Sequence, residues 1–215
     1  MFENVNTVIF DFDGTMVDSI SVWKKMNFDY FKEFGVNLEE ESINKLLNLT
    51  CSETAEYSTK NFNITLTTNQ IRNFWIEKGI EYYDKYVLLK EGIREFLELL
   101  RKNNFKIGIA TNNIRPITDY FLKKEDMLKN IDFICTMDDV QIRKPDPEMY
   151  FKVAKFLESD MTNCLVFEDS IVGLIAAKRA GMKVCAVLNG QSVDKIDELK
   201  VISDYQVSSF KDIKI

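Results

Sequence analysis

The chain has 215 residues, of which 46% are hydrophobic, and its formal net charge is -6. This length and apolar content suffice for one large domain, or for one domain with a smaller insertion. The acidic balance argues against nucleic-acid binding, which needs a basic face, and no stretch has the length and apolarity of a membrane span. The sequence has no histidine, which excludes Ser-His-Asp and Cys-His catalysis and histidine-ligated zinc.

Short apolar segments alternate with helical patterns along most of the chain. Five runs are apolar almost throughout and predict strands buried on both faces, at 7–12, 106–111, 133–136, 164–169 and 183–187. A helical pattern precedes each of the last four, and further helices are predicted at 91–104 and 169–181. Ser170 is a candidate N-cap of the latter helix and Gly181 a candidate end. This alternation predicts an α/β fold with a parallel sheet, closed by a short edge strand within 203–215.

The stretch between the first two predicted strands has a different character. Roughly ninety residues separate these strands, far more than a crossover connection needs. Helical periodicity recurs there around 20–34, 39–48, 53–61 and 68–85, with no proline. We interpret residues 19–88 as an inserted all-helical subdomain and residues 1–18 and 89–215 as the core domain. The alternative is that these helices belong to one larger domain.

Polar residues stand at the carboxyl ends of the predicted strands, where open parallel sheets bind their ligands. They are Asp11 and Asp13 after the first strand, Thr111 and Asn112 after the second, Lys144 after the third, and Glu168 and Asp169 after the fourth. Four clustered acids repel one another without a cation, and ligands that are all oxygen favour Mg²⁺ over zinc or copper. Taken alone, each pair also has a structural interpretation: Asp13-Gly14 as a turn and Asp169-Ser170 as a helix cap.

This set of side chains suits phosphoryl transfer. A metal ion, a lysine and backbone amides together form a binding site for a phosphoryl group. Asp11 can attack phosphorus, because a carboxylate forms an acyl phosphate. Asp13 can protonate the departing oxygen and later accept a proton from water. Lys144 and Thr111 can hold the equatorial oxygens.

The turn after the first strand contains three further residues of interest. Gly14 is expected to allow a sharp turn, and Thr15 to fix that turn through its hydroxyl. Asp18 is interpreted as an N-cap or hinge residue where the helical insertion begins.

Four segments resemble the motifs of the haloacid dehalogenase superfamily, in the expected order. "DFDGTMVDS" resembles the first motif, "IGIATN" the second, "RKPDPEMY" the third and "VFEDSIVGLIAAKRAGM" the fourth, in the E-D-S form of the β-phosphoglucomutase-like group. The resemblance covers residues 7 to about 187 and implies a Rossmann-like three-layer core with a helical cap. The resemblance also implies that Asp11 is the nucleophile and Asp13 the acid–base residue. Mg²⁺ would be held by the Asp11 side chain, the backbone carbonyl of Asp13 and the Asp169 side chain, with help from Glu168. Phosphate would be bound by Thr111, Asn112 and Lys144.

The family resemblance implies a Mg²⁺-dependent phosphohydrolase that forms an aspartyl phosphate. Its substrates would be small phosphorylated metabolites of the sugar phosphate, nucleotide or phosphoglycolate type. The family's dehalogenases lack the second aspartate and need no metal, so Asp13 and Glu168-Asp169 favour phosphoryl transfer.

Three alternatives remain open. A mutase like β-phosphoglucomutase would carry a G-x-S-R-like cap loop and a cap histidine, where this chain reads "NLTCSE" and "SISVWK". A phosphonatase would need a cap lysine that forms a Schiff base. A non-catalytic regulator that binds Mg²⁺ and phosphate would be expected to lack Asp11, Asp13 or Lys144.

Specificity is expected to come from the cap, with Ser19, Ser21, Trp23, Lys24 and the loop 46–54 as candidates. We expect Trp23 to serve in packing rather than in recognition. The partner would be a small phosphorylated substrate, without nucleic acid or membrane, and the protein a monomer or weak dimer.

The four cysteines indicate a reducing environment. Cys135, Cys164 and Cys185 lie in strand-like segments and are expected to be buried and reduced, whereas Cys51 lies in a polar stretch and is expected to be more exposed. The N-terminal residues have no basic region before their short apolar run, which favours a cytoplasmic location over secretion.

Overall fold

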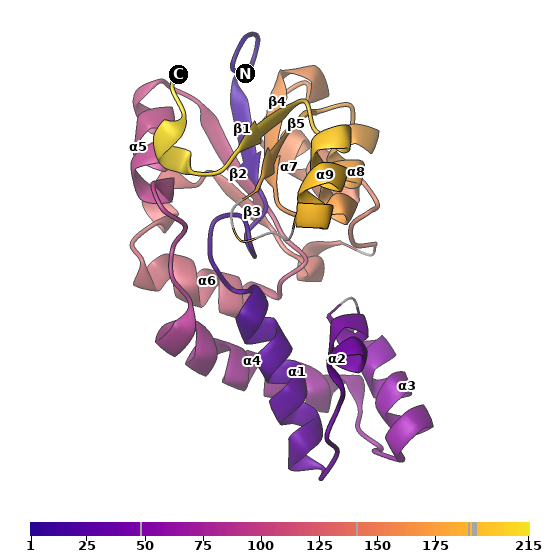
Figure 1. Ribbon diagram of the computed structural model, residues 1–215. Helices are drawn as coiled ribbons and strands as arrows, with labels where there is room; N and C mark the ends of the chain where they lie inside the picture. The colour runs from indigo at the N-terminus through magenta and orange to yellow at the C-terminus, as the bar shows by residue number, and fades with distance from the viewer. Residues whose placement is uncertain (48, 141, 189, 191–192) are drawn as a thin grey trace. The chain divides into compact units, whose positions relative to one another are not determined.

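The computed structural model describes residues 1–47, 49–140, 142–188, 190 and 193–215 (Figure 1). The chain divides into two compact units, one formed by Met1–Asp18 and Leu88–Ile215 and the other by Ser19–Val87. Among the described helices, none combines the length and the apolar character that crossing a bilayer requires. Asn48, which falls in the loop proposed to contribute to specificity, lies outside the described residues.

The first unit is built on a parallel sheet of six described strands in the order β3-β2-β1-β4-β5-β6. The strands are β1 Thr7–Phe10, β2 Lys106–Ala110, β3 Phe133–Cys135, β4 Cys164–Glu168, β5 Lys183–Val187 and β6 Tyr205–Val207. The five predicted strands and the edge strand are thus confirmed, as is the Rossmann-like α/β class. Because the order reverses between β1 and β4, their carboxyl ends form the switch point at which this fold binds ligands.

Several strands end one or two residues earlier than predicted. Asp11, Thr111 and Asp169 were included in strands but lie in the loops that follow them. Asp11 N–H still donates to Phe167 O at 2.9 Å, and Thr111 N–H to Cys135 O at 2.9 Å. The sheet therefore holds the backbone of these residues, while their side chains stand beyond its edge.

Helices cover both faces of the sheet and make three layers. They are α5 Ile93–Lys102, α6 Arg115–Lys124, α7 Glu148–Phe156, α8 Ile171–Arg179 and α9 Val193–Ile202. Figure 1 shows α7, α8 and α9 on one side of the sheet and α5 on the other. Successive side chains of β1 point to opposite faces of the sheet, so β1 contributes to the core on both sides. Ile9 joins the core under α7 and α8, whereas Phe10 faces the rings of Phe96 and Phe167.

The second unit contains α1 Ile20–Glu33, α2 Glu40–Leu46, α3 Cys51–Phe62 and α4 Thr68–Tyr86. Capping boxes begin two of these helices, with Thr50 and Glu53 at α3 and Thr67 and Gln70 at α4. The Trp23 ring lies 6.0 Å from that of Trp75, and its Nε1–H donates to Tyr83 Oη at 2.9 Å. Trp23 therefore packs inside this unit, as predicted.

One expectation about a residue near the helical unit is wrong, and of the two roles considered for Asp18, N-cap or hinge, the first is excluded. Cys51 is buried, with 7% of its surface exposed, because α3 begins at this residue and turns the side chain inward while Ser52 and Glu53 face outward. Asp18 is not an N-cap, since Ser19 holds that position at α1. Asp18 instead forms an ion pair with Lys90 at 3.6 Å.

Helix α8 begins very close to the end of β4. Ser170 is its N-cap, as predicted, and its Oγ accepts a hydrogen bond from Gly173 N–H at 3.1 Å. The predicted end of the helix is also confirmed, because Gly181 has a positive φ of 78°. A Cβ at Gly173 would lie 1.8 Å from Glu168 Oε1. Glycine is therefore required at position 173 by the lack of space for a side chain. The backbone there has ordinary helical angles, which any residue could adopt.

We predict that Gly173→Ala destabilises the protein by about 1–3 kcal/mol, since Glu168 or the start of α8 must move to admit a methyl group. The measurement is the midpoint of urea unfolding followed by circular dichroism. Val172→Ala, at a partly exposed position on the same helix, is the matched control and should change the free energy of unfolding by less than about 0.5 kcal/mol. An unchanged midpoint for Gly173→Ala would mean that the steric constraint is absent in solution.

Candidate active site

A buried lysine joins two carboxylates at the switch point of the sheet. Lys144 Nζ donates to Asp11 Oδ1 at 2.7 Å and to Glu168 Oε1 at 2.9 Å. The exposed fractions are 4% for Lys144, 6% for Asp11 and 1% for Glu168. The two acids face one another because β1 and β4 are adjacent and Phe10 pairs with Phe167 in their register. Three segments distant in the sequence thus meet in one ion-pair network.

The charge of Lys144 is maintained by its neighbours. Burial alone would lower the pKa of Lys144, but the Asp11 and Glu168 carboxylates outweigh burial and hold that pKa well above its usual value. The Nζ atom also lies 5.2 Å from the centre of the Tyr150 ring, within the range of a cation–π contact. Lys144 therefore stays an ammonium that can bind an anion.

Three buried carboxylates lie close enough to share a cation. Asp11, Glu168 and Asp169 each offer an oxygen, and these atoms lie within 4.8 Å of one another. Burial raises the pKa of Asp11, Lys144 opposes that rise, and the charges of Glu168 and Asp169 add to it. The cluster thus carries more negative charge than Lys144 can offset. Its donors are all oxygen, which fits a hard divalent cation of the Mg²⁺ or Ca²⁺ type.

Glu168 differs from Asp169 in its protein partners. Its Oε1 accepts from Lys144, while its Oε2 accepts from Ser170 N–H at 2.7 Å and from Ser170 Oγ–H at 2.8 Å. Both oxygens of Glu168 are therefore engaged by donors of the chain. Glu168 therefore holds Lys144 at the edge of the sheet through one oxygen and binds Ser170, at the start of α8, through the other.

The turn after β1 brings its backbone against Asp169. Gly14 has a φ of 82°, and a Cβ there would lie 2.2 Å from Asp169 Oδ2, so both backbone conformation and space require glycine. The expectation for Thr15 is not met, because its hydroxyl reaches Asp169 Oδ1 at 3.5 Å instead of fixing the turn. The turn is held by backbone bonds, among them Gly14 N–H to Val17 O at 2.8 Å.

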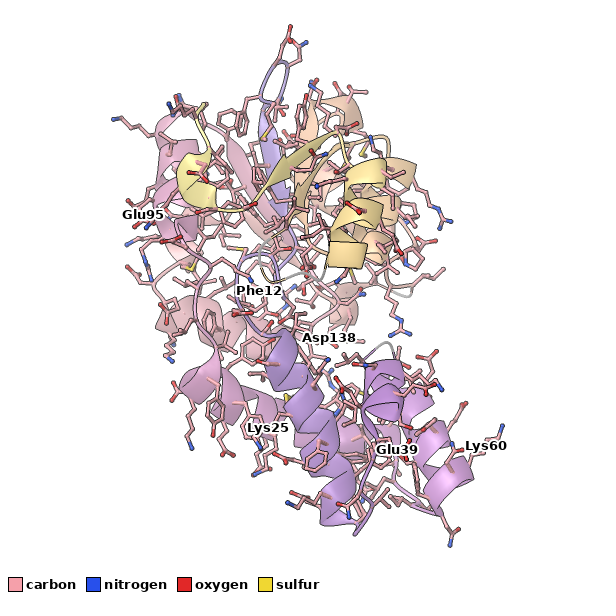
Figure 2. The ribbon with its side chains drawn as sticks, in the orientation of Figure 1. Phe12, Lys25, Glu39, Lys60, Glu95 and Asp138 are labelled. Carbon is pink, nitrogen blue, oxygen red and sulfur yellow. The ribbon has the colours of Figure 1, made fainter. Side chains whose placement is uncertain are left out.

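Asp11 and Asp13 flank a buried aromatic residue. Phe12 is fully buried, and its ring lies 5.9 Å from that of Phe121. Figure 2 shows Phe12 and Asp138, which follow β1 and β3, at the carboxyl end of the sheet. The side chain of Phe12 thus anchors the segment that carries the two aspartates.

The loop after β2 contains a polar residue that sequence reasoning missed. Asn113 Nδ2–H donates to Asp13 Oδ2 at 2.8 Å, and Asn113 N–H donates to Thr111 Oγ1 at 3.0 Å. The neighbouring Asn112, which was predicted, accepts from Lys144 N–H through its Oδ1 at 3.3 Å. The sequence reads "TNN" at this loop, so the second asparagine was the available signal. Hydrogen bonds therefore join Asn112, Asp11 and Glu168 to Lys144, and a second set joins Asp13 to Thr111 through Asn113. Asp169 completes the predicted set by proximity, because one of its oxygens lies within 4.8 Å of those of Asp11 and Glu168.

The comparisons with known proteins agree with this geometry. Residues 8–187 match the family model of the haloacid dehalogenase-like hydrolases. The Bacillus subtilis (strain 168) protein YhcW, whose name provisionally classes it as a phosphatase, is 30% identical over 186 residues, which are 86% of this chain and 84% of that protein. The phosphorylated carbohydrates phosphatase of Thermotoga maritima (strain ATCC 43589 / DSM 3109 / JCM 10099 / NBRC 100826 / MSB8) is 29% identical over 184 residues, 83% of each chain.

A solved structure shows the same fold. A variant of CbbY from Rhodobacter sphaeroides, in complex with xylulose-(1,5)bisphosphate, superimposes with a TM-score of 0.84 at 20% identity, over 97% of this chain and 96% of that one. The family match extends from β1 to the end of β5 and so includes each loop that contributes to the acidic cluster. This chain therefore belongs to the haloacid dehalogenase-like hydrolases and is a phosphoric monoester hydrolase of that family.

Proposed function

We propose that the enzyme hydrolyses small phosphorylated metabolites with the help of Mg²⁺ and through an aspartyl phosphate on Asp11. The observation that carries this proposal is the buried contact of 2.7 Å between Asp11 Oδ1 and Lys144 Nζ, next to Asp169. A carboxylate nucleophile beside an ammonium can meet a phosphoryl group whose oxygens the ammonium attracts. The same contact keeps the nucleophile in one orientation before the substrate arrives.

The first step transfers the phosphoryl group to the enzyme. The Asp11 carboxylate forms a bond to phosphorus while the bond from phosphorus to the substrate oxygen breaks. Asp13, in its protonated form, gives its proton to that departing oxygen, so the substrate leaves as an alcohol. Lys144, Thr111 and Asn112 hold the phosphoryl oxygens.

The second step returns the enzyme to its starting form. Water attacks the phosphorus of the acyl phosphate, and Asp13, now a carboxylate, accepts a proton from this water. The bond from phosphorus to Asp11 breaks, which releases inorganic phosphate and restores the Asp11 carboxylate. The sum of both steps is one phosphate ester and one water converted to one alcohol and one phosphate.

Asp11, Asp169 and the backbone carbonyl of Asp13 would hold the Mg²⁺ ion, with Glu168 assisting through its hold on Lys144. When bound, the ion supplies positive charge that offsets the carboxylates and the charge of the phosphoryl group. The buried oxygen donors of Asp11, Glu168 and Asp169 support this assignment.

Phosphorylated carbohydrates are the substrate class that we propose. Relatives of this chain are named phosphorylated carbohydrates phosphatase, hexitol phosphatase B and 6-phosphogluconate phosphatase. A phosphate-release screen would compare sugar and hexitol phosphates with nucleotides and phosphoglycolate. A mutase would instead convert a hexose 1-phosphate to the 6-phosphate faster than it releases phosphate.

We also propose that the enzyme works as a monomer or weak dimer in the reducing cytoplasm. The described cysteines are buried and form no disulfide with one another, and burial raises the pKa of Cys135 to about 11. Burial likewise raises the pKa of Cys164 and of Cys185, so these three thiols are poorly ionised and protected from oxidation.

We predict that Asp11→Asn lowers kcat for phosphate release by at least about 1,000-fold, since an amide cannot form the acyl phosphate. The measurement is phosphate release with Mg²⁺ from the best substrate of the screen, together with trapping of the phosphoenzyme by hydroxylamine. Asp160→Asn, at an exposed position before β4, is the matched control and should retain wild-type activity. Full activity in Asp11→Asn would overturn the assignment of the nucleophile.

We predict that Mg²⁺ raises the melting temperature by about 3–10 °C at about 10–100 times its Kd, because the ion binds the folded state alone. Asp169→Asn should abolish this shift. Without metal, this variant should melt at or above the wild-type temperature, because it removes one of the repelling carboxylates. Asp160→Asn again serves as control and should keep the full shift. A shift that survives in Asp169→Asn would place the metal elsewhere.

A further inference from the structure

Asn113 stands at the junction of three loops at the carboxyl edge of the sheet. Its exposed fraction is 2%, so its polar atoms need partners within the protein. Besides the bonds to Asp13 and Thr111, its Oδ1 accepts from Ile114 N–H at 2.7 Å and its backbone O accepts from Met137 N–H at 3.2 Å. The residue thus links the loops after β1, β2 and β3.

The orientation of the Asn113 amide follows from its own contacts. Ile114 N–H is a donor, so the atom that faces it must be the acceptor Oδ1. The other end of the amide, Nδ2, is then the atom that faces Asp13 Oδ2. The backbone at the start of α6 therefore directs the Nδ2 donor of Asn113 toward the Asp13 carboxyl. A flipped amide would place Nδ2 against the Ile114 N–H donor and Oδ1 against the Asp13 carboxylate acceptor, and both hydrogen bonds would be lost.

We infer that Asn113 is a positioning residue that holds the Asp13 carboxyl in the orientation needed for proton transfer to the departing oxygen. This role rests on the proposed function, in which Asp13 is the acid–base group. Asp13 lies in a turn and is half-buried, so the turn alone leaves rotation about its side-chain bonds. The bond from Asn113 fixes one oxygen of the carboxyl and thereby the direction of the other.

A leaving group that needs no proton separates this role from a general structural one. An alkoxide leaves phosphorus slowly unless an acid protonates it, whereas p-nitrophenolate leaves without protonation. The ratio kcat/KM reports the steps up to formation of the phosphoenzyme and excludes its later hydrolysis. Loss of the Asn113 bond should therefore reduce kcat/KM for an alkyl phosphate and spare it for an aryl phosphate.

The experiment compares wild type, Asn113→Ala and Asn113→Asp on two substrates, p-nitrophenyl phosphate and glucose 6-phosphate, or sorbitol 6-phosphate if the wild type prefers it. We expect Asn113→Ala to lower kcat/KM for the sugar phosphate by about 10- to 100-fold, as for a lost hydrogen bond to a group that becomes charged while it gives up its proton. The value for p-nitrophenyl phosphate should stay within about threefold. The Kd for inorganic phosphate, measured by calorimetry, should stay within about twofold, because Lys144 and Thr111 are unchanged.

The second substitution at Asn113 and one control variant keep the test decisive. Asn113→Asp retains the acceptor for Ile114 N–H and places an oxygen against Asp13. Its loss of kcat/KM for the sugar phosphate, relative to p-nitrophenyl phosphate, should therefore exceed that of Asn113→Ala, even if the alanine variant folds poorly. Asn103→Ala, at an exposed asparagine that caps the end of α5, is the control for asparagine removal and should match wild type on both substrates.

The outcomes distinguish this inference from the function on which it rests. Equal losses on the two substrates, or a weakened Kd for phosphate, would show that Asn113 supports the phosphate site and would overturn the positioning role alone. Unchanged kcat/KM for both substrates would overturn it as well. A wild-type enzyme that hydrolyses neither substrate would overturn the proposed function together with this role.

Discussion

The buried ion-pair network of Lys144 with Asp11 and Glu168 is the interaction on which the rest of the site depends. Burying an ammonium costs several kcal/mol unless opposite charges and good hydrogen bonds offset the lost hydration. Here two carboxylates at 2.7 and 2.9 Å provide that compensation, and each is fixed by its place beside adjacent strands. The sheet therefore stabilises the charged form of Lys144, and Lys144 in turn holds the two acids toward the same point.

Two glycines permit the carboxylates to lie where the network needs them. Gly14 lets the loop after β1 approach Asp169, and Gly173 lets α8 start against Glu168. The reasons differ, because Gly14 needs both a positive φ and space, whereas Gly173 needs space alone. Each glycine thus makes room for one acid, Gly14 for Asp169 and Gly173 for Glu168. The acidic cluster is a product of close packing between loops and helix ends as much as of strand order.

Much of the fold and site could be predicted because their signals are local. Apolar runs marked the strands, and each acid followed one of them in the sequence. Cys51 was misplaced because its burial follows from where α3 begins, although "TCSE" is the pattern of a capping box and could have located that start. The contact between Asn113 and Asp13 joins residues 100 positions apart. Such a hydrogen bond depends on tertiary packing and leaves no periodic trace in a single sequence.

The charge balance of the site links stability to function. Lys144 compensates part of the negative charge of Asp11, Glu168 and Asp169, and what remains opposes folding in the absence of a cation. A core of aromatic and branched side chains below the cluster supplies the stability that tolerates this repulsion. The same unbalanced charge attracts a cation to the three carboxylates. The feature that costs the fold stability is therefore the one that, in the proposed function, prepares it to bind a metal ion and a phosphate ester.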